Sequence, residues 1–278
     1  MKISKAIIPV AGYGTRRLPI TKAIEKNMLP VGNRPVIDYV VQDCIAAGIR
    51  DFYFVVGEQS SQLRTFYGHN QPLEDHLREH NKTQYIEQIQ PPRNCTFNYI
   101  VQDSQQSYGT AVPVWLARDI LNDDEHALII MGDQFFYHED GSSEAAWFLG
   151  AAQRAGTPAA MLAVEVPREE VSHYGILATT KDGEFDHYDH IVEKPSIEDA
   201  PSNLNNASFY LFNKAMINEV SAYMETSREG EYLLTDPINS YAAAGNNIAV
   251  IRAQGQYLDC GNVEGWLHAN EVVCRRQD

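Results

Sequence analysis

The stretch Ala6-Ile7-Ile8-Pro9-Val10-Ala11-Gly12-Tyr13-Gly14-Thr15-Arg16-Arg17 indicates the fold class of this 278-residue chain. Its first half is a short apolar run typical of a buried strand, and its second half is a turn with two closely spaced glycines and two arginines. Glycines let backbone N–H groups turn toward an anion, and arginines add charged donors. The stretch therefore predicts a strand that ends in a phosphate-binding loop.

Positive charge is concentrated at and just after this turn. Four lysine or arginine residues fall within positions 16–26, where Glu25 is the single acid, whereas the whole chain has 22 Lys and Arg against 37 Asp and Glu and a net charge of −15. We expect a site for an anionic ligand here. The acidic balance of the chain argues against DNA, RNA or an anionic membrane as partners, because they carry the same sign of charge.

The composition also bears on the cellular compartment. No apolar run reaches the roughly 18 residues of a membrane-spanning helix, and the N-terminal residues lack the long apolar core and cleavage site of a signal peptide. The four cysteines are widely scattered and form no CxxC pair, which favours reduced thiols. The sequence therefore predicts a cytoplasmic protein with no membrane-spanning helix.

Apolar runs alternate with helical patterns along the chain, which is the signature of βαβ units and a largely parallel sheet. Residues 60–95 are polar and poorly periodic, which predicts a helical excursion on the surface. We expect one α/β domain over residues 1–278. Strands are expected near 5–10, 52–57, 96–101, 127–131, 159–166, 175–180, 188–193 and 207–212, and helices near 35–47, 113–121, 143–155 and 214–225.

The glycine loop differs from the two best-known phosphate-binding patterns. Arg17 stands where GxGxxG needs its third glycine, and the loop does not match GxxxxGK[ST] either. An NAD-dependent oxidoreductase would also need an acid about 20 residues further on for the ribose, and Asp38, on a predicted helix, is a poor candidate. Both the dinucleotide-binding and the P-loop interpretations therefore lose support.

Two aspartates, Asp133 and Asp259, each follow a strand-like run. An acid at the carboxyl end of a strand lies where open α/β sheets bind ligands, although each could simply cap a turn. If the two carboxylates meet over a phosphate-binding loop, they would bind Mg²⁺, which takes oxygen ligands and bridges phosphates. Sequence spacing leaves open whether they meet.

Two further positions carry candidate chemistry. Glu193 and Lys194 are an adjacent acid and base at a strand end, where a carboxylate can accept from sugar hydroxyls and an ammonium can hold a phosphate, or both can simply be solvated. Gln102 follows another strand, and its side-chain amide can both donate to and accept from the edge of a base. An ordinary surface glutamine remains the alternative.

The opening of the chain closely resembles bacterial UTP–glucose-1-phosphate uridylyltransferases, which belong to the sugar-nucleotidyltransferase superfamily. The resemblance starts with KAIIPVAGYGTR at 5–16 and continues with LPITKAI at 18–24 and KNMLP at 26–30. It spans nearly the whole chain in the family's order. Later matches are VSHYGI at 171–176, VEKP at 192–195, DAPSNL at 199–204, LTD at 234–236 and DCG at 259–261.

This resemblance implies a Rossmann-like nucleotidyltransferase fold with a mixed, mostly parallel central sheet flanked by helices. It also implies a nucleotide-binding part over about 1–135, a sugar-binding part over about 136–278, and a homodimer or homotetramer. The expected reaction is Mg²⁺-dependent attack of a sugar 1-phosphate, most simply glucose 1-phosphate, on a nucleoside triphosphate, most simply UTP, giving UDP-glucose and pyrophosphate.

The resemblance also gives the candidate residues roles. The nucleotide would be bound by Ala11, Gly12, Gly14, Thr15, Arg16, Lys26, Gln102 and Gly109; the sugar phosphate by Gly175, Glu193 and Lys194; and the metal by Asp133 and Asp259. Catalysis itself would rest on Arg16, Lys26, Asp133 and Lys194.

The chain departs from the family pattern near the expected base and sugar. Glu25 and Asn27 replace the proline and glutamate of Pro-Lys-Glu-Met, and Thr110 replaces the histidine of Gly-His-Ala. Ser208-Phe209 replaces Gly-Arg, and Gln134 stands where an acid often follows the metal-binding aspartate. Transfer to another sugar, use of dTTP, CTP or ATP, and a catalytically weak regulatory homologue are therefore the alternatives.

Overall fold

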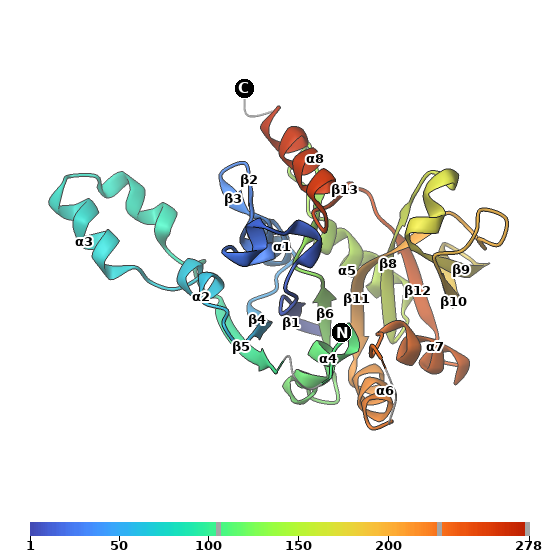
Figure 1. Ribbon diagram of the computed structural model, residues 1–278. Helices are drawn as coiled ribbons and strands as arrows, with labels where there is room; N and C mark the ends of the chain where they lie inside the picture. The colour runs from blue at the N-terminus through green and yellow to red at the C-terminus, as the bar shows by residue number, and fades with distance from the viewer. Residues whose placement is uncertain (104–106, 227–229, 276–278) are drawn as a thin grey trace.

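The computed structural model describes residues 1–103, 107–226 and 230–275, apart from the side chain of Asp182 (Figure 1). Its centre is a nine-stranded sheet with the strand order β5-β4-β1-β6-β11-β8-β12-β10-β9. The strands are β1 (Lys2–Pro9), β4 (Asp51–Gly57), β5 (Thr96–Gln102), β6 (Glu125–Ile130), β8 (Ala159–Glu165), β9 (Gly175–Asp182), β10 (Phe185–Glu193), β11 (Leu204–Asn213) and β12 (Ile248–Arg252).

The sheet is mixed, as the resemblance implies, but it is not mostly parallel, because four of its eight neighbouring strand pairs in the described residues are parallel and four are antiparallel. Parallel pairing prevails in the N-terminal half, where β1 lies between β4 and β6 and β4 pairs with β5. In the C-terminal half β8 and β12 are parallel, whereas β11 runs antiparallel to β6 and β8, and β10 runs antiparallel to β12 and β9. Strands from before and after residue 135 thus share one sheet; the assignment of the two parts to nucleotide and sugar stays a prediction.

Helices cover both faces of the sheet because its strands alternate apolar side chains between the two sides. In β1, Ala6 and Ile8 belong to one buried core and Ile7 to the other. The first core is completed by α1 (Val36–Ala46), α5 (Glu144–Ala155) and α8 (Val263–Cys274), and the second by α4 (Ala111–Leu116), α6 (Lys214–Met224) and α7 (Thr235–Ala243) (Figure 1).

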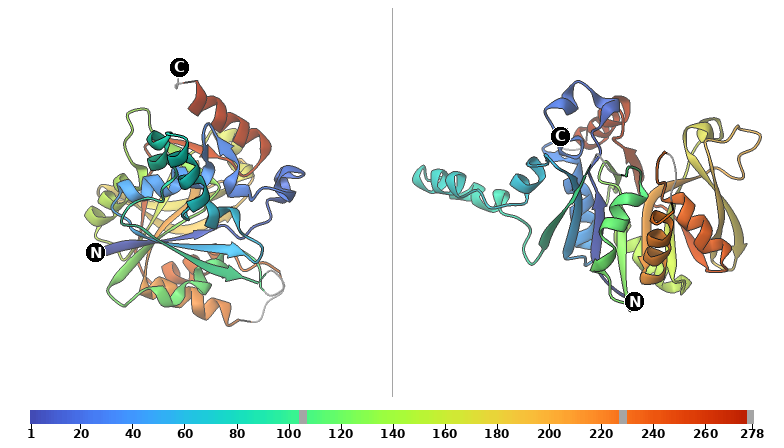
Figure 2. Two further views of the ribbon diagram at one scale, coloured as in Figure 1. Left: turned by 90° about the vertical axis from the view of Figure 1, so that its left-hand side faces the viewer. Right: turned by 60° about the horizontal axis from the view of Figure 1, so that its bottom comes forward.

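The expected excursion at 60–95 is an arm that extends away from the sheet between β4 and β5 (Figures 1 and 2). It consists of α2 (Gln62–Phe66), α3 (Gln71–Glu79) and the 3-10 segment Thr83–Ile89. The arm begins directly at the carboxyl end of β4, so its first residues lie beside the glycine loop that follows β1.

A small second sheet was not expected from the sequence. It pairs β7 (Gln134–Tyr137) antiparallel to β13 (Gln256–Asp259), with Asp259 opposite Gln134. Two shorter strands, β2 (Pro30–Val31) and β3 (Arg34–Pro35), form a further hairpin. Short 3-10 turns occupy Thr15–Arg17, Ile20–Lys22, Lys26–Met28, Arg118–Ile120 and Arg168–His173.

None of the helices in the described part of the chain combines the length and apolarity that a bilayer-spanning helix requires.

Candidate active site

The glycine loop after β1 folds over the side chain of Lys26. Gly14 has a left-handed φ of 66°, and a Cβ there would lie 2.8 Å from the Lys26 Cβ and 3.0 Å from the Thr21 Cγ2. The Thr21 hydroxyl donates to the Gly14 carbonyl oxygen at 2.9 Å, which fixes this turn. A Cβ on Gly12 would lie 3.4 Å from the Lys26 Cε. Gly14 is therefore needed, because its backbone is left-handed and the Lys26 side chain passes directly beneath it, whereas Gly12 makes ordinary contact with the same side chain.

The loop borders a cavity of about 640 Å³. All eight residues predicted to bind the nucleotide line it, and so does Asp133. Its walls come from the β1 loop, the end of β5 and the start of α4, which the parallel sheet brings to one edge. The eight are Ala11, Gly12, Gly14, Thr15, Arg16, Lys26, Gln102 and Gly109.

An ion-pair cluster lies at this cavity. The Lys26 ammonium is 2.7 Å from Asp133 Oδ2, and the Arg17 guanidinium reaches the same oxygen at 3.5 Å. Arg17 also donates to the Lys26 carbonyl oxygen at 2.8 Å. Burial alone would raise the pKa of Asp133, but the charges and hydrogen bonds of its neighbours, above all Lys26, hold it below its ordinary value. Asp133 is therefore ionised at neutral pH.

Arg17 is a residue of this site that the sequence interpretation did not assign. Its side chain is only 1% exposed, whereas the predicted Arg16 is exposed at the cavity wall. A buried arginine needs a partner, and here it finds Asp133 and the backbone of Lys26. The one available signal was the doubled arginine of the loop, which did not indicate which of the two turns inward.

The structure brings Asp133 and Asp259 together, which sequence spacing could not decide. Asp259 lies opposite Gln134 in the β7–β13 pair, and the Cys260 N–H donates to the Asp133 carbonyl oxygen at 3.0 Å. The pKa of Asp259 is raised, first by burial and also by the Asp133 charge, although the Gly261 N–H donates to its carboxylate at 2.7 Å. The two acidic side chains therefore lie close enough for the charge of Asp133 to act on Asp259.

The predicted sugar-phosphate residues form a second group. Gly175 and Glu193 are directly paired across β9 and β10, and a Cβ on Gly175 would lie 3.2 Å from both Glu193 carboxylate oxygens. Lys194 has a left-handed φ of 47°, and its N–H donates to the Tyr174 carbonyl oxygen at 2.9 Å. This backbone is strained for a residue with a side chain, and such strain gathers at functional sites. The side chains of Glu193 and Lys194 are exposed.

Tyr174 links this group to the acid pair. Burial raises the pKa of the Tyr174 hydroxyl, and the charges of Glu170 and Asp259 raise it further. Tyr174 is thus close enough to feel the charge of Asp259 while its backbone holds Lys194.

Three of the departures from the family pattern, at Thr110, Gln134 and Ser208, occupy structural positions outside the ion pairs of Lys26 and Arg17. Thr110 accepts the Leu234 N–H through its hydroxyl at 2.8 Å, at the end of the cavity near Gly109. Gln134 is buried, accepts from the Tyr257 hydroxyl at 2.8 Å and donates to the Ala207 carbonyl oxygen. Ser208 adopts a left-handed φ of 50° beside it.

Known proteins of one family are similar to this chain over nearly its whole length. A family model described as nucleotidyl transferase matches residues 5–276. The UTP–glucose-1-phosphate uridylyltransferase of Haemophilus influenzae is 33% identical, with 95% of this chain and 91% of the relative covered. That of Bacillus subtilis is 32% identical, with 96% and 89% covered.

Solved structures show the same fold. An apo UDP-glucose pyrophosphorylase has a TM-score of 0.88 and 29% identity, over 99% of this chain and 100% of that one. A UTP-bound UGPase from Acinetobacter baumannii has a TM-score of 0.87 and 27% identity, over 98% and 93%. The resemblance and the Rossmann-like nucleotidyltransferase fold inferred from the sequence are therefore confirmed, and this chain belongs to the nucleotidyl transferase family.

Proposed function

We propose that this protein is a Mg²⁺-dependent UTP–glucose-1-phosphate uridylyltransferase, which makes UDP-glucose and pyrophosphate. One observation carries the proposal: a cavity of about 640 Å³ gathers the glycine loop, Arg16, Lys26 and Asp133. The names of the relatives support UTP and glucose 1-phosphate as the substrates, and related structures contain UTP and UDP-glucose.

The reaction needs little from the protein except position and charge. A phosphate oxygen of the sugar 1-phosphate attacks the α-phosphorus of the triphosphate, the new P–O bond forms, and the bond to pyrophosphate breaks. Because the attacking phosphate is already ionised, no covalent nucleophile and no strong general base is required. The protein has to bind the triphosphate and the sugar phosphate side by side although both are anions. Its cationic groups offset their repulsion, which is electrostatic stabilisation of the reacting phosphates.

In our proposal the triphosphate and the sugar phosphate are bound by different cationic side chains. Arg16 and Lys26 hold the triphosphate, while the loop residues Gly12 and Gly14 let backbone N–H groups approach it. Lys26 has three donors, of which one goes to Asp133, so the other two are able to bind phosphate. Lys194 holds the sugar phosphate, and Glu193 accepts from the sugar hydroxyls, with Gly175 leaving room for the ring.

Nucleotidyltransferases of this family generally use a divalent metal ion. The adjacent carboxylates Asp133 and Asp259 fit Mg²⁺, because they offer hard oxygen ligands beside the triphosphate cavity. Within the described residues no group of three or more His, Cys, Asp or Glu gathers for a metal. In our proposal the remaining ligands are phosphate oxygens and water, as is usual for Mg²⁺. When bound, the ion would neutralise phosphate charge.

The test is pyrophosphate release over a matrix of UTP, dTTP, CTP and ATP against several sugar 1-phosphates. We expect the highest kcat/KM for UTP with glucose 1-phosphate, and a loss of turnover when Mg²⁺ is chelated. A higher value for another pair would reassign the substrates. Binding of UTP without turnover for any sugar phosphate would identify a regulatory homologue instead.

We also propose that the enzyme works in the cytoplasm as a homodimer or homotetramer. The four cysteines Cys44, Cys95, Cys260 and Cys274 are unpaired, which fits a reducing compartment. The oligomeric state is argued by analogy with the family. Light scattering on the purified protein would measure it, and a monomer would contradict it.

A further inference from the structure

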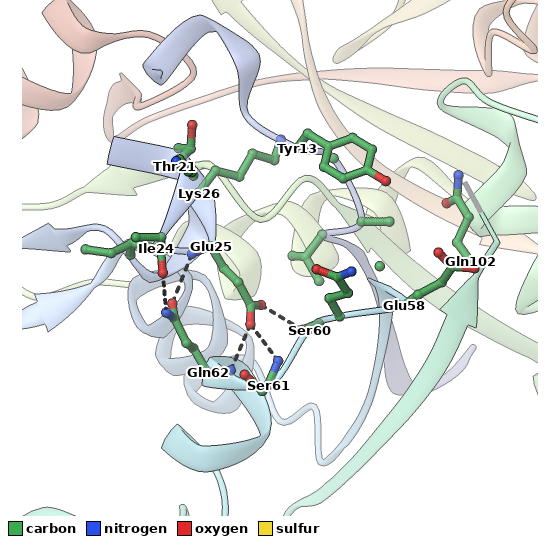
Figure 3. Close-up of a pocket in the computed structure, with 17 residues that line it drawn as sticks. Tyr13, Thr21, Ile24, Glu25, Lys26, Glu58, Ser60, Ser61, Gln62 and Gln102 are labelled. Carbon is green, nitrogen blue, oxygen red and sulfur yellow. Dashed lines mark hydrogen bonds between the residues drawn. The ribbon is translucent and has the colours of Figure 1, made fainter. Parts of the chain in front are cut away.

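Glu25 is the acid within the otherwise cationic stretch 16–26, at a position where the related family has proline. Its carboxylate accepts three hydrogen bonds from the start of the arm (Figure 3). The donors are the Ser60 hydroxyl at 2.7 Å, the Ser61 N–H at 2.7 Å and the Gln62 N–H at 2.8 Å. Glu25 thus binds the first N–H groups of α2, which has no side-chain cap of its own from Ser61.

Gln62 completes the contact in the opposite direction. Its side-chain oxygen accepts the Glu25 N–H at 3.0 Å, and its side-chain amide donates to the Ala23 carbonyl oxygen at 2.9 Å (Figure 3). Five hydrogen bonds therefore join residues 23–25 to residues 60–62. We call this reciprocal contact of Glu25 and Gln62 the clasp.

The clasp adjoins Lys26 in the chain. Lys26 belongs to a short 3-10 turn, so its position depends on contacts with other segments. On one side, Arg17 donates to the Lys26 carbonyl oxygen at 2.8 Å. On the other, the clasp fixes both the N–H and the carboxylate of the preceding residue, Glu25. The same residues line a cavity of about 300 Å³ that also borders Gly12 and Lys26.

We propose that the clasp is a positioning device: Glu25 and Gln62 fix the backbone at Lys26 so that its ammonium lies under the glycine loop, ready for the triphosphate. The inference rests on the proposed function of Lys26 as a triphosphate ligand. It also explains the departure from the family pattern, because a proline could supply neither the N–H nor the carboxylate of Glu25. In this chain the Glu25 and Gln62 side chains form hydrogen bonds that a proline at position 25 could not form.

Glu25→Gln separates positioning from simple electrostatics, because the two predict opposite signs. Removal of a negative charge beside a phosphate site should strengthen anion binding if Glu25 acts only through its charge. If the clasp positions Lys26, weaker acceptance from the Ser60, Ser61 and Gln62 donors should reduce UTP affinity. We expect UTP to bind about threefold to tenfold more weakly in Glu25→Gln and in Gln62→Ala, measured by calorimetric titration.

A second part of the experiment repeats the titrations in a Lys26→Ala background. Because the clasp acts through Lys26, neither clasp substitution should weaken UTP binding further in that background. In the protein that keeps Lys26, Glu25→Gln combined with Gln62→Ala should weaken UTP binding no more than the stronger of the two single substitutions does. In the active enzyme the KM for glucose 1-phosphate should stay within about twofold. If the substrate pair is reassigned, the same titrations with the triphosphate that gives the highest kcat/KM test the clasp, because they measure binding at Lys26 and not turnover.

Two substitutions on the same arm serve as controls. Gln71→Ala removes a hydrogen bond to Asp75 within α3, and Glu87→Gln removes an exposed ion pair with Arg93, and neither residue contacts the clasp. Both should bind UTP as the unaltered protein does, and circular dichroism verifies folding of every variant. Unchanged or tighter UTP binding by the folded clasp variants would overturn the proposal. So would an equal loss with and without Lys26, because that result indicates a merely structural contact.

Discussion

At the scale of single residues, the two neighbouring aspartates of the site, Asp133 and Asp259, have pKa values shifted in opposite directions. Lys26 and Arg17 hold the pKa of Asp133 below its ordinary value, whereas burial and the charge of Asp133 raise the pKa of Asp259. The difference follows from the cations: Lys26 and Arg17 both contact Asp133, while Asp259 receives the Gly261 N–H. Asp133 is consequently the aspartate whose negative charge the neighbouring cations of the chain stabilise more strongly.

Asp133→Asn tests this assignment. The substitution keeps the shape of the side chain but removes the charge that faces both cations and, in our proposal, the metal. We expect kcat to fall by about 100-fold or more, because a charge that acts on the transferring phosphates is lost. Steady-state rates at saturating Mg²⁺ measure it, with circular dichroism as the check on folding. A near-normal rate would show that the proposed metal site is wrong.

Lys194→Ala addresses the other end of the site. Lys194 is exposed and held in a left-handed conformation beside Tyr174, separate from the cavity that the nucleotide residues line. We expect the KM for glucose 1-phosphate to rise about tenfold or more while the KM for UTP changes less than about twofold. Equal losses for both substrates would contradict its assignment to the sugar phosphate.

At the scale of elements, two strand pairings set the site. The β7–β13 pair brings Asp133 and Asp259 together, and the parallel β1–β4 pairing places the glycine loop beside the start of the arm. At the opposite end of the sheet, Glu125 at the start of β6 binds Lys2 and Lys5 of β1. Hydrogen bonds from Lys5, Asn122 and Lys2 lower the pKa of Glu125 from 4.5 to about 2.

Glu125→Gln should therefore reduce stability in a pH-dependent way. A carboxylate whose pKa is lower in the folded state stabilises the fold above its unfolded pKa, and this contribution is lost as the pH falls through the folded value. For Glu125 the loss should occur between 4.5 and about 2. We expect Tm of the variant to lie below that of the unaltered protein near about pH 7 and the two to converge as the pH falls toward about 2. A Tm difference that is independent of pH would contradict the ion-pair role of Glu125.

At the scale of the whole molecule, the fold class could be predicted from the sequence, whereas the contacts between segments far apart in the chain could not. The apolar run 6–10 and the glycines after it identify β1 and its loop because both signals are local. The contact of Asp133 with Arg17 and the β7–β13 pair depend on segments far apart in the chain, for which local patterns carry no information. Helix α8 was likewise not expected, although Ala269 and Val273 on it are buried in the core.

The residues predicted to bind the nucleotide and those predicted to bind the sugar phosphate come from different parts of the sheet. The nucleotide cavity is lined by the β1 loop, the end of β5 and the start of α4, while Glu193 ends β10 and Lys194 follows it. Figure 1 shows β9 and β10 at the other side of the sheet from β5. Asp133 and Asp259 come one from each half of the chain, and the Cys260 N–H donates to the Asp133 carbonyl oxygen. The proposed transfer between two phosphates requires two separate groups of binding residues, because each anion needs its own cations.

The most direct test of this chemistry is chromatographic identification of the products from UTP and glucose 1-phosphate with Mg²⁺. We expect UDP-glucose and pyrophosphate to form in equal amounts, and neither to form when glucose 1-phosphate is omitted. Consumption of UTP without UDP-glucose, or UTP that binds and remains unconsumed, would contradict the proposed uridylyl transfer.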